Sequence, residues 1–246
     1  MEGVIRVLKA VTFDLWNTVI RTKPGEDIDG AVTERLAGVL EQCGYERPKA
    51  KITEATIECR NKVLDLQVNE GREMPPKEQV TWILAALDIS ASAELRADFY
   101  KAYTTVTLEQ LPEPIPGVAR VLAQLQETLD LALICNTGKT PGSVARIILE
   151  RLGLKKYFTH LIFSDEVGVA KPHPKIFEQT LAALAVRPEQ TVHIGDDPRT
   201  DVRGARNIGM HTAWLAHGRD SGGVKCDLIV HEWKDFLGWV QERVTR

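Results

Sequence analysis

The sequence has little cysteine, no strong excess of either charge and no long apolar run. Its 246 residues include four cysteines, which are far apart and form no C-x-x-C pair: Cys43, Cys59, Cys135 and Cys226. This spacing argues against a zinc site or a disulfide framework and suits a reducing cytosol. The formal net charge is only −3, so the chain lacks the basic character typical of nucleic-acid-binding proteins.

No apolar stretch approaches the roughly 20 residues that are needed to span a bilayer. The first residues do not combine a basic segment with a following apolar segment, the arrangement typical of a signal peptide. Hydrophobic residues make up 43% and charged residues 26%, as in globular proteins. We therefore expect a cytoplasmic protein whose partner is a small molecule, with no nucleic acid and no membrane involved. The oligomeric state stays open.

In the C-terminal half, short apolar segments alternate with amphipathic ones. We expect strands at 129–135, 161–163, 191–194 and 212–215, and helices at 118–126, 142–152, 175–185 and 201–207. Continuously apolar strands that alternate with helices predict a parallel sheet covered on both faces. The β-rich segment 6–13 is expected to join this sheet, because a lone strand has no pairing partner.

The intervening residues 21–113 follow a helical rhythm, and we expect about four helices and no strand there. Three prolines within 112–116 mark a stiff connector and a domain boundary. The chain is therefore predicted to be an α/β protein with a Rossmann-like parallel-sheet core and an inserted all-helical domain. The core comprises residues 1–20 and 114–246, and the insertion comprises residues 21–113.

Polar residues follow several of the expected strands. Asp14 follows the first, Asn136 and Thr137 follow the second, and Asp196 and Asp197 follow a later one. Asp and Asn at such positions most often make turns or cap helices. The carboxyl ends of parallel strands, however, form the usual ligand crevice of an open sheet. Several polar residues at equivalent positions therefore favour a binding site.

Four short motifs contain these residues. In chain order they are Phe13-Asp14-Leu15-Trp16-Asn17-Thr18, Ile134-Cys135-Asn136-Thr137-Gly138, Lys171-Pro172-His173-Pro174 and Gly195-Asp196-Asp197-Pro198-Arg199-Thr200-Asp201. As an ordered set they resemble the motifs of the haloacid dehalogenase superfamily of hydrolases. The inserted helical segment resembles the cap that one class of this family places after its first strand, so the resemblance covers nearly the whole chain.

This resemblance implies a Mg²⁺-dependent phosphatase that acts on a small phosphorylated metabolite. Asp14 would be the nucleophile that forms a covalent aspartyl-phosphate. The metal ligands would be Asp14, the main-chain carbonyl of Trp16, Asp196 and Asp201, an oxygen set that suits Mg²⁺. Lys171 would neutralise Asp14 and the transferring group. Without a cation the crowded carboxylates would repel one another, and the pKa of at least one would rise.

The implied substrate contacts come from the same motifs. They are Trp16, Thr18, Asn136, Thr137 and Lys171, and Asn136 and Lys171 also count with Asp14 as catalytic. The family usually has Ser or Thr where Cys135 aligns, and a thiol is a weak hydrogen-bond donor. Asn136 or Thr137 is therefore expected to contact the phosphoryl oxygen, and the sequence leaves open whether Cys135 or Thr137 fills the Ser/Thr position.

Trp16 is the main departure from the family pattern. Phosphatases of the superfamily carry a second aspartate there, which protonates the leaving group. A positioned general acid typically contributes about 10²–10⁴-fold, so alkyl phosphates should turn over slowly, and aryl or acyl phosphates should be affected less. His173 or a residue of the inserted helices could supply the proton instead, which the sequence leaves open.

Two alternative functions remain. The family's haloacid dehalogenases also have an aromatic residue at the position of Trp16 and attack carbon with the same aspartate, but without a metal. Their last motif lacks the Gly-Asp start that Gly195-Asp196 provides here, so the phosphatase is favoured. The second alternative is a catalytically weak phosphate-binding protein. Arg35, Arg60 and Arg72 are candidates to bind a substrate carboxylate in either case.

Overall fold

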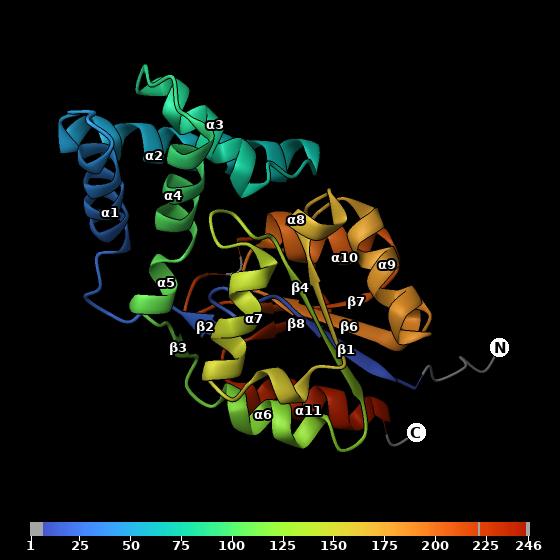
Figure 1. The fold of residues 1–246 in the computed structure, drawn as a ribbon. Helices are drawn as coiled ribbons and strands as arrows, with labels where there is room; N and C mark the ends of the chain where they lie inside the picture. Colours follow the sequence, from blue (N-terminus) through green and yellow to red (C-terminus); the bar gives the residue numbers. More distant parts are fainter. Residues whose placement is uncertain (1–6, 221, 245–246) are drawn as a thin grey trace.

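The computed structural model describes residues 7–220 and 222–244. Its centre is a six-stranded sheet in the order β5-β4-β1-β6-β7-β8, in which every neighbouring pair is parallel (Figure 1). The strands are β1 (Ala10–Phe13), β4 (Asp130–Cys135), β5 (His160–Phe163), β6 (Thr191–Gly195), β7 (His211–Leu215) and β8 (Leu228–Val230). The predicted α/β class with a Rossmann-like parallel sheet is confirmed.

Helices cover both faces of this sheet. Those on one face are α6 (Val118–Leu125), α7 (Gly142–Arg151) and α11 (Trp233–Val244), which share a hydrophobic cluster with Phe13 and Leu133. Those on the other face are α9 (Pro174–Leu184) and α10 (Arg203–Asn207), which pack around Ile134 through Phe177 and Ala205. Figure 1 shows α6 and α11 below the sheet and α9 and α10 above it. Short turns complete this part: η2 (Lys155–Tyr157), α8 (Ser164–Val167) and η3 (Pro188–Gln190).

Between β2 (Ile20–Arg21) and β3 (Glu113–Pro114) the chain forms a helical block. Its elements are α1 (Ile28–Gln42), α2 (Lys49–Asp65), the π-helical turn η1 (Leu66–Glu70), α3 (Pro76–Ala86), α4 (Ala93–Thr104) and α5 (Val106–Glu109). Leu36, Ile52, Ile83 and Phe99 belong to a hydrophobic cluster of the block's own, separate from that of the sheet. Figure 1 shows the block beyond the end of the sheet toward which β1 runs.

The structure corrects two expectations about residues 21–113. The range is not free of strands, because Arg21 and Glu113 pair in the antiparallel ribbon of β2 and β3. The chain enters and leaves the block side by side at this ribbon, and two-residue strands carry no readable period. The block also has five α-helices instead of about four, since the helical rhythm is interrupted at Thr105, between α4 and α5.

Three further boundaries differ from the sequence-based expectations. The first strand begins at Ala10, and Arg6 lies outside the described residues. The segment 201–207 is not one α-helix, because the π-helical turn η4 (Pro198–Val202) precedes α10. The edge strand β8 has only three residues, too few for its apolar pattern to be recognised.

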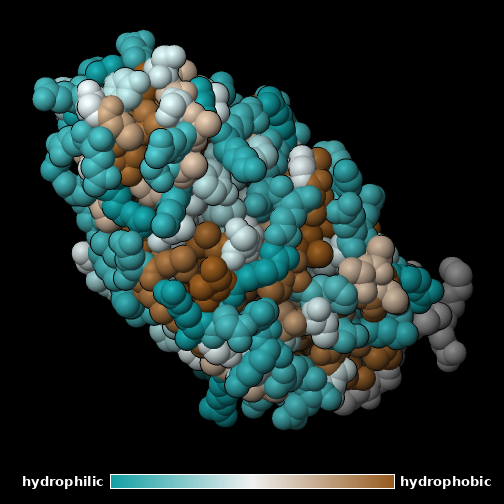
Figure 2. All heavy atoms as spheres, in the orientation of Figure 1, coloured by the Kyte–Doolittle hydropathy of each residue, from teal (hydrophilic) through white to brown (hydrophobic). Residues whose placement is uncertain are grey.

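Most of the surface in the view of Figure 2 is hydrophilic, with an apolar area over α7. Ile147, on this helix, is 43% exposed. Within the part of the chain that the structure describes, no helix is long and apolar enough to cross a membrane.

We expect Phe13→Ala to lower the free energy of unfolding by about 3–5 kcal/mol, the usual cost of removing a buried aromatic ring. Phe13 is fully buried in the central strand, and its ring meets those of Phe158 and Phe236 edge to face at centroid distances of 6.0 and 6.3 Å. Urea denaturation measures the change. Ile147→Ala is the control, expected within about 0.5 kcal/mol of wild type. A Phe13→Ala effect as small as the control's would contradict this account of the core.

Candidate functional site

Three neighbouring strands end in polar residues at the same edge of the sheet. Asp14 follows β1, Asn136 follows β4 and Asp196 follows β6. Because β4, β1 and β6 are adjacent and parallel, their carboxyl ends bring these side chains together. The helical block lies beyond the same edge (Figure 1).

The ammonium of Lys171 is buried between two carboxylates. Its side chain is 1% exposed, and Nζ lies 2.6 Å from Oδ1 of Asp14 and 2.8 Å from Oδ1 of Asp201. Nζ also donates to the main-chain oxygen of Ile134 at 2.7 Å. Each of the three ammonium protons therefore has an acceptor. Burial lowers the pKa of Lys171, but Asp14 and Asp201 outweigh it and raise the pKa above its usual value, so Lys171 stays charged.

Asn136 fixes the main chain of Lys171. Its Oδ1 accepts from the N–H of Lys171 at 2.8 Å, and its Nδ2 donates to the carbonyl of the same residue at 2.9 Å. The side-chain amide of Asn136 thus positions the lysine. Its expected contact with a phosphoryl oxygen stays a prediction.

A chain of buried groups holds Asp201. The N–H of Asp197 donates to Oδ2 of Asp201 at 3.0 Å, and Nε2 of His193 lies 3.5 Å from Oδ1. On its other side, Nδ1 of His193 lies 2.9 Å from the hydroxyl of Thr12. Burial lowers the pKa of His193, so the imidazole is neutral. The sequence offers no signal for this supporting role, because His193 stands inside an apolar strand.

Asp14, Asp196 and Asp201 form an acidic cluster in which one carboxylate oxygen of each lies within 4.8 Å of the others. Burial, and then the charges of Asp14 and Asp201, raise the pKa of Asp196 to about 8. Burial also raises the pKa of Asp14 to about 6, against the opposing charge of Lys171. For Asp201, Lys171 outweighs burial and holds the pKa well below its usual range.

This cluster fits a divalent cation. When all the groups are ionised, three carboxylates and the ammonium of Lys171 leave two negative charges, which one Mg²⁺ neutralises. The donors are oxygens, the ligands that Mg²⁺ prefers. Gly195 leaves room for the arrangement, because a Cβ at that position would overlap the carboxylate of Asp201. The carbonyl of Trp16 as a further ligand stays a prediction.

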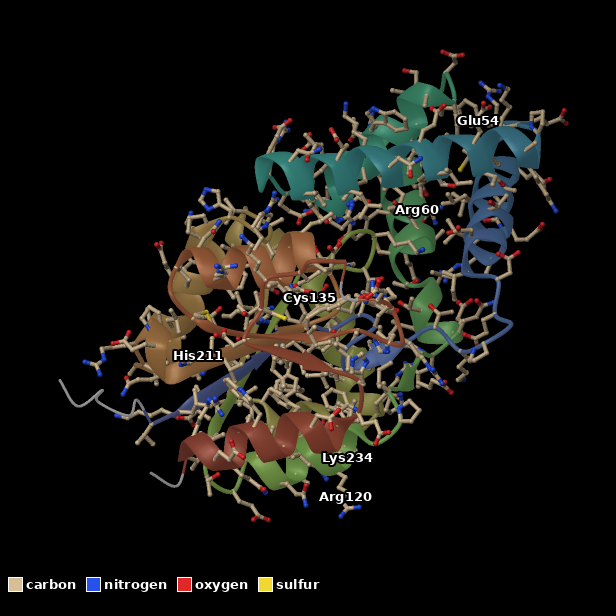
Figure 3. All side chains as sticks on the ribbon, turned by 180° about the vertical axis from the view of Figure 1, so that it is seen from behind. Glu54, Arg60, Arg120, Cys135, His211 and Lys234 are labelled. Atoms are coloured by element: carbon tan, nitrogen blue, oxygen red, sulfur yellow. The ribbon has the colours of Figure 1, made fainter. Side chains whose placement is uncertain are left out.

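A pocket of about 540 Å³ lies between the sheet and the helical block, and its lining includes residues next to the cluster in the chain or bonded to Lys171, though not the three carboxylates themselves. Its walls include Trp16, Asn136 and Thr137 on the sheet side and Arg60 and Gln79 on the block side. Figure 3 shows Arg60 on the side of α2 that faces the sheet. Cys135, at the end of β4, marks the sheet in this view. Gln79 is 1% exposed and joins the two parts, since its Nε2 donates to the carbonyl of Gly138 at 2.9 Å. No sequence pattern signals Gln79.

Of the predicted residues Thr137, Cys135 and Thr18, Thr137 lines the pocket and the other two do not. Its N–H donates to Oγ of Ser164 at 2.9 Å, a partner that was not predicted. The thiol of Cys135 donates to the carbonyl of Asn136 at 3.3 Å, and burial raises its pKa well above the usual value. Thr18 is fully buried, its hydroxyl has no partner among the described residues, and it does not line the pocket.

The chain matches known proteins over most of its length. The family model of haloacid dehalogenase-like hydrolases matches residues 8–209. The chain is 29% identical over 234 residues to a glyceraldehyde 3-phosphate phosphatase of Pyrococcus furiosus, covering 95% of this chain and 90% of that protein. It is 27% identical over 245 residues to a phosphoglycolate phosphatase of Photorhabdus laumondii, covering 96% and 94%.

Solved structures show the same fold. A 2-haloacid dehalogenase of Pseudomonas syringae superimposes with a TM-score of 0.71 at 23% identity and covers 96% of this chain and 99% of its own. A magnesium-bound HAD hydrolase of Bacillus subtilis superimposes with a TM-score of 0.67 at 18% identity, with coverages of 96% and 99%. At these identities the likeness establishes the architecture alone.

We expect the free energy of unfolding of chelator-treated wild type, taken relative to that of Asp196→Asn, to fall by about 2 kcal/mol between pH 5 and pH 7. The pKa of Asp196 in the folded chain is about 8, above the usual 3.8, so its proton stabilises the fold at low pH and is lost as the pH rises. Urea denaturation at the two pH values measures the difference. Mg²⁺ at pH 7 should stabilise wild type more than the variant. A pH-independent difference would contradict the raised pKa.

Proposed function

Since the chain belongs to the haloacid dehalogenase-like hydrolases, we propose that it is a Mg²⁺-dependent phosphatase acting on a small phosphorylated metabolite. The observation that carries this proposal is the buried Asp14–Lys171 pair within a cluster of carboxylates that fits a divalent cation. The names of the relatives support it, because they are phosphatases of glyceraldehyde 3-phosphate and phosphoglycolate.

Asp14 is the nucleophile in this mechanism. Lys171 binds Oδ1 and orients the carboxylate, so that Oδ2 attacks phosphorus while the bond from phosphorus to the leaving oxygen breaks. The leaving oxygen takes its proton from a water molecule, which becomes hydroxide. Hydroxide then attacks the phosphorus of the aspartyl-phosphate, the bond from phosphorus to Asp14 breaks, and inorganic phosphate and the carboxylate of Asp14 are released. Throughout, Lys171 neutralises charge beside the transferring group.

Asp14, Asp196, Asp201 and the carbonyl of Trp16 would hold Mg²⁺, which neutralises the oxygens of the phosphoryl group when bound. In this proposal residues 21–113 form a cap over the core of 1–20 and 114–246, and the cap excludes water and selects the substrate. The separate hydrophobic clusters of the two parts support this division. The four cysteines are free thiols, which supports a cytoplasmic location.

Trp16 determines which substrates react well. It lines the pocket, two residues after the nucleophile, and its indole cannot protonate an alkoxide. His173 caps α9 through Nδ1, which accepts from the N–H of Lys175, and it does not line the pocket, so it is poorly placed to protonate a leaving group there. Leaving groups that depart without a proton, as in aryl or acyl phosphates, should therefore be favoured.

Asp14→Asn should reduce hydrolysis of 4-nitrophenyl phosphate in the presence of Mg²⁺ by about 10³-fold or more, because the attacking oxygen is lost. Steady-state release of 4-nitrophenolate measures it, and removal of Mg²⁺ from wild type should also abolish turnover. Asp98→Asn, an exposed acid on α4, is the control and should keep the wild-type rate.

If wild type with Mg²⁺ hydrolyses neither 4-nitrophenyl phosphate nor acetyl phosphate, the phosphatase proposal fails. Halide release from 2-chloropropionate would then indicate attack of Asp14 on carbon, the reaction that the aromatic Trp16 would also allow. Saturable binding of phosphate compounds without any turnover would instead indicate a binding protein.

Trp16→Asp should raise kcat for an alkyl ester such as ethyl phosphate by about 10²-fold or more, because the new carboxylic acid can protonate the alkoxide. Trp16→Asn is the matched control: it opens the pocket equally but carries no transferable proton. Equal gains in the two variants would show that Trp16 limits the reaction by its size and not by the missing acid.

A further inference from the structure

Three of the five charged side chains in the pocket wall form an ion-paired group that the chemistry at Asp14 does not use. They are Asp29 of α1, Arg60 of α2 and Lys139 of the loop after β4. Oδ2 of Asp29 lies 2.6 Å from Nη1 of Arg60, and Oδ1 lies 3.8 Å from Nζ of Lys139. One carboxylate is thus shared by two cations, and the group carries a net positive charge.

Lys139 is the incompletely paired member of this group. Its side chain is only 24% exposed, and its ion pair with Asp29 is longer than a hydrogen bond. Burial lowers the pKa of Lys139, Asp29 opposes that effect, and the nearby charge of Arg60 adds to it. An anion in the pocket would give this ammonium the close acceptor that Asp29 does not provide.

The other arginines suggested by the sequence are engaged away from the pocket. Arg35 donates to the hydroxyl of Thr105 at 2.8 Å and pairs with Glu109 at 3.4 Å, while Arg72 pairs with Glu78 at 3.2 Å. Neither Arg35 nor Arg72 lines the pocket. The structure therefore singles out Arg60 from the three candidates.

Two further acids line the pocket. Asp27 accepts from the N–H of Gly30 and caps α1, while Glu26 lies 3.8 Å from Lys23 and its Oε2 is buried without a hydrogen-bond partner among the described residues. Asp29 is the acid of the pocket wall that pairs with Arg60 and Lys139 and would compete with a bound anion for them.

We propose that Arg60 and Lys139 bind a carboxylate of the substrate, so that the enzyme selects small phosphate compounds that carry a carboxylate away from the phosphoryl group. This inference rests on the proposed phosphatase function. Lys139 is three residues from Asn136, which lines the same pocket and holds Lys171 beside Asp14, so the pocket wall runs from Arg60 and Lys139 to a residue next to the acidic cluster. Because Glu26, Asp27 and Asp29 also line the pocket, a monoanionic carboxylate is repelled less there than a second, dianionic phosphoryl group would be.

Binding of two phosphonates tests the site without requiring turnover. With Mg²⁺ present, wild type should bind 3-phosphonopropionate about tenfold or more tighter than 3-phosphonopropionamide, as measured by calorimetry. Arg60→Gln and Lys139→Met should each bring this ratio of Kd values toward one. Asp29→Asn should change it in the opposite direction, because it removes the competing carboxylate.

Arg72→Gln is the matched control, an exposed arginine on the same helical block that should leave the ratio at its wild-type value. A ratio near one in wild type, or a ratio that survives both Arg60→Gln and Lys139→Met, would overturn the proposal. Lys139→Gln provides a second variant at the more buried position, and thermal melting shows that each variant is folded.

Hydrolysis of 4-carboxyphenyl and 4-carbamoylphenyl phosphate separates the two proposals. A preference in kcat/KM for the carboxylate that Arg60→Gln and Lys139→Met reduce supports both. Equal kcat/KM values in wild type leave the phosphatase standing and remove the carboxylate site. Selective phosphonate binding without hydrolysis of either ester leaves the carboxylate site standing and removes the phosphatase.

Discussion

The buried ammonium of Lys171 is the interaction on which the rest of the site depends. Taking an ammonium out of water costs several kcal/mol, and this cost is recovered only when its charge is paired and its protons all have acceptors. Here the acceptors come from the end of β1, the main chain of β4 and the turn η4. The site therefore requires that β4, β1 and β6 be neighbours and that their carboxyl ends lie at the same edge of the sheet.

The same pairing explains the state of the third carboxylate. Lys171 lies between Asp14 and Asp201. Among the described residues Asp196 has no comparable cation, since Arg219 lies 3.8 Å away with its side chain 48% exposed. Burial and the charges of its neighbours then favour the protonated form of Asp196. A divalent ion bound here would release that proton, so the electrostatics that hold Lys171 also make the cluster suited to a metal.

Much of this arrangement is predictable from the sequence. Apolar strands that alternate with helices predicted the parallel sheet, and polar residues at strand ends predicted where Asp14, Asn136 and Asp196 would meet. Strand ends are readable because burial on both faces leaves a long apolar run that stops abruptly at the first polar residue. The ribbon of β2 and β3 and the turn η4 are too short to show a period.

The supporting contacts of the site are not predictable in the same way. The contact of Asn136 with a phosphoryl oxygen stays a prediction, and its amide also binds the main chain of Lys171, 35 residues later in the chain, a contact that no sequence pattern signals. His193 supports Asp201 only because η4 turns the chain back onto β6. Arg35, Arg60 and Arg72 look alike in the sequence, and the packing of α1 against α2 decides that Arg60 faces the pocket. Such choices depend on tertiary packing, which sequence spacing does not contain.

Trp16 and the cationic group of Arg60 and Lys139 bear on one energetic problem. An enzyme that cannot protonate its leaving group must obtain transition-state stabilisation elsewhere, and binding energy from a remote part of the substrate is a general source. A carboxylate held at Lys139 would fix the substrate relative to Asp14, because Gln79 ties the loop of Lys139 to the helical block. The side chain of Trp16 lines the same pocket. Loss of the general acid is therefore compatible with efficient turnover of a substrate whose leaving group is good and whose far end is anchored.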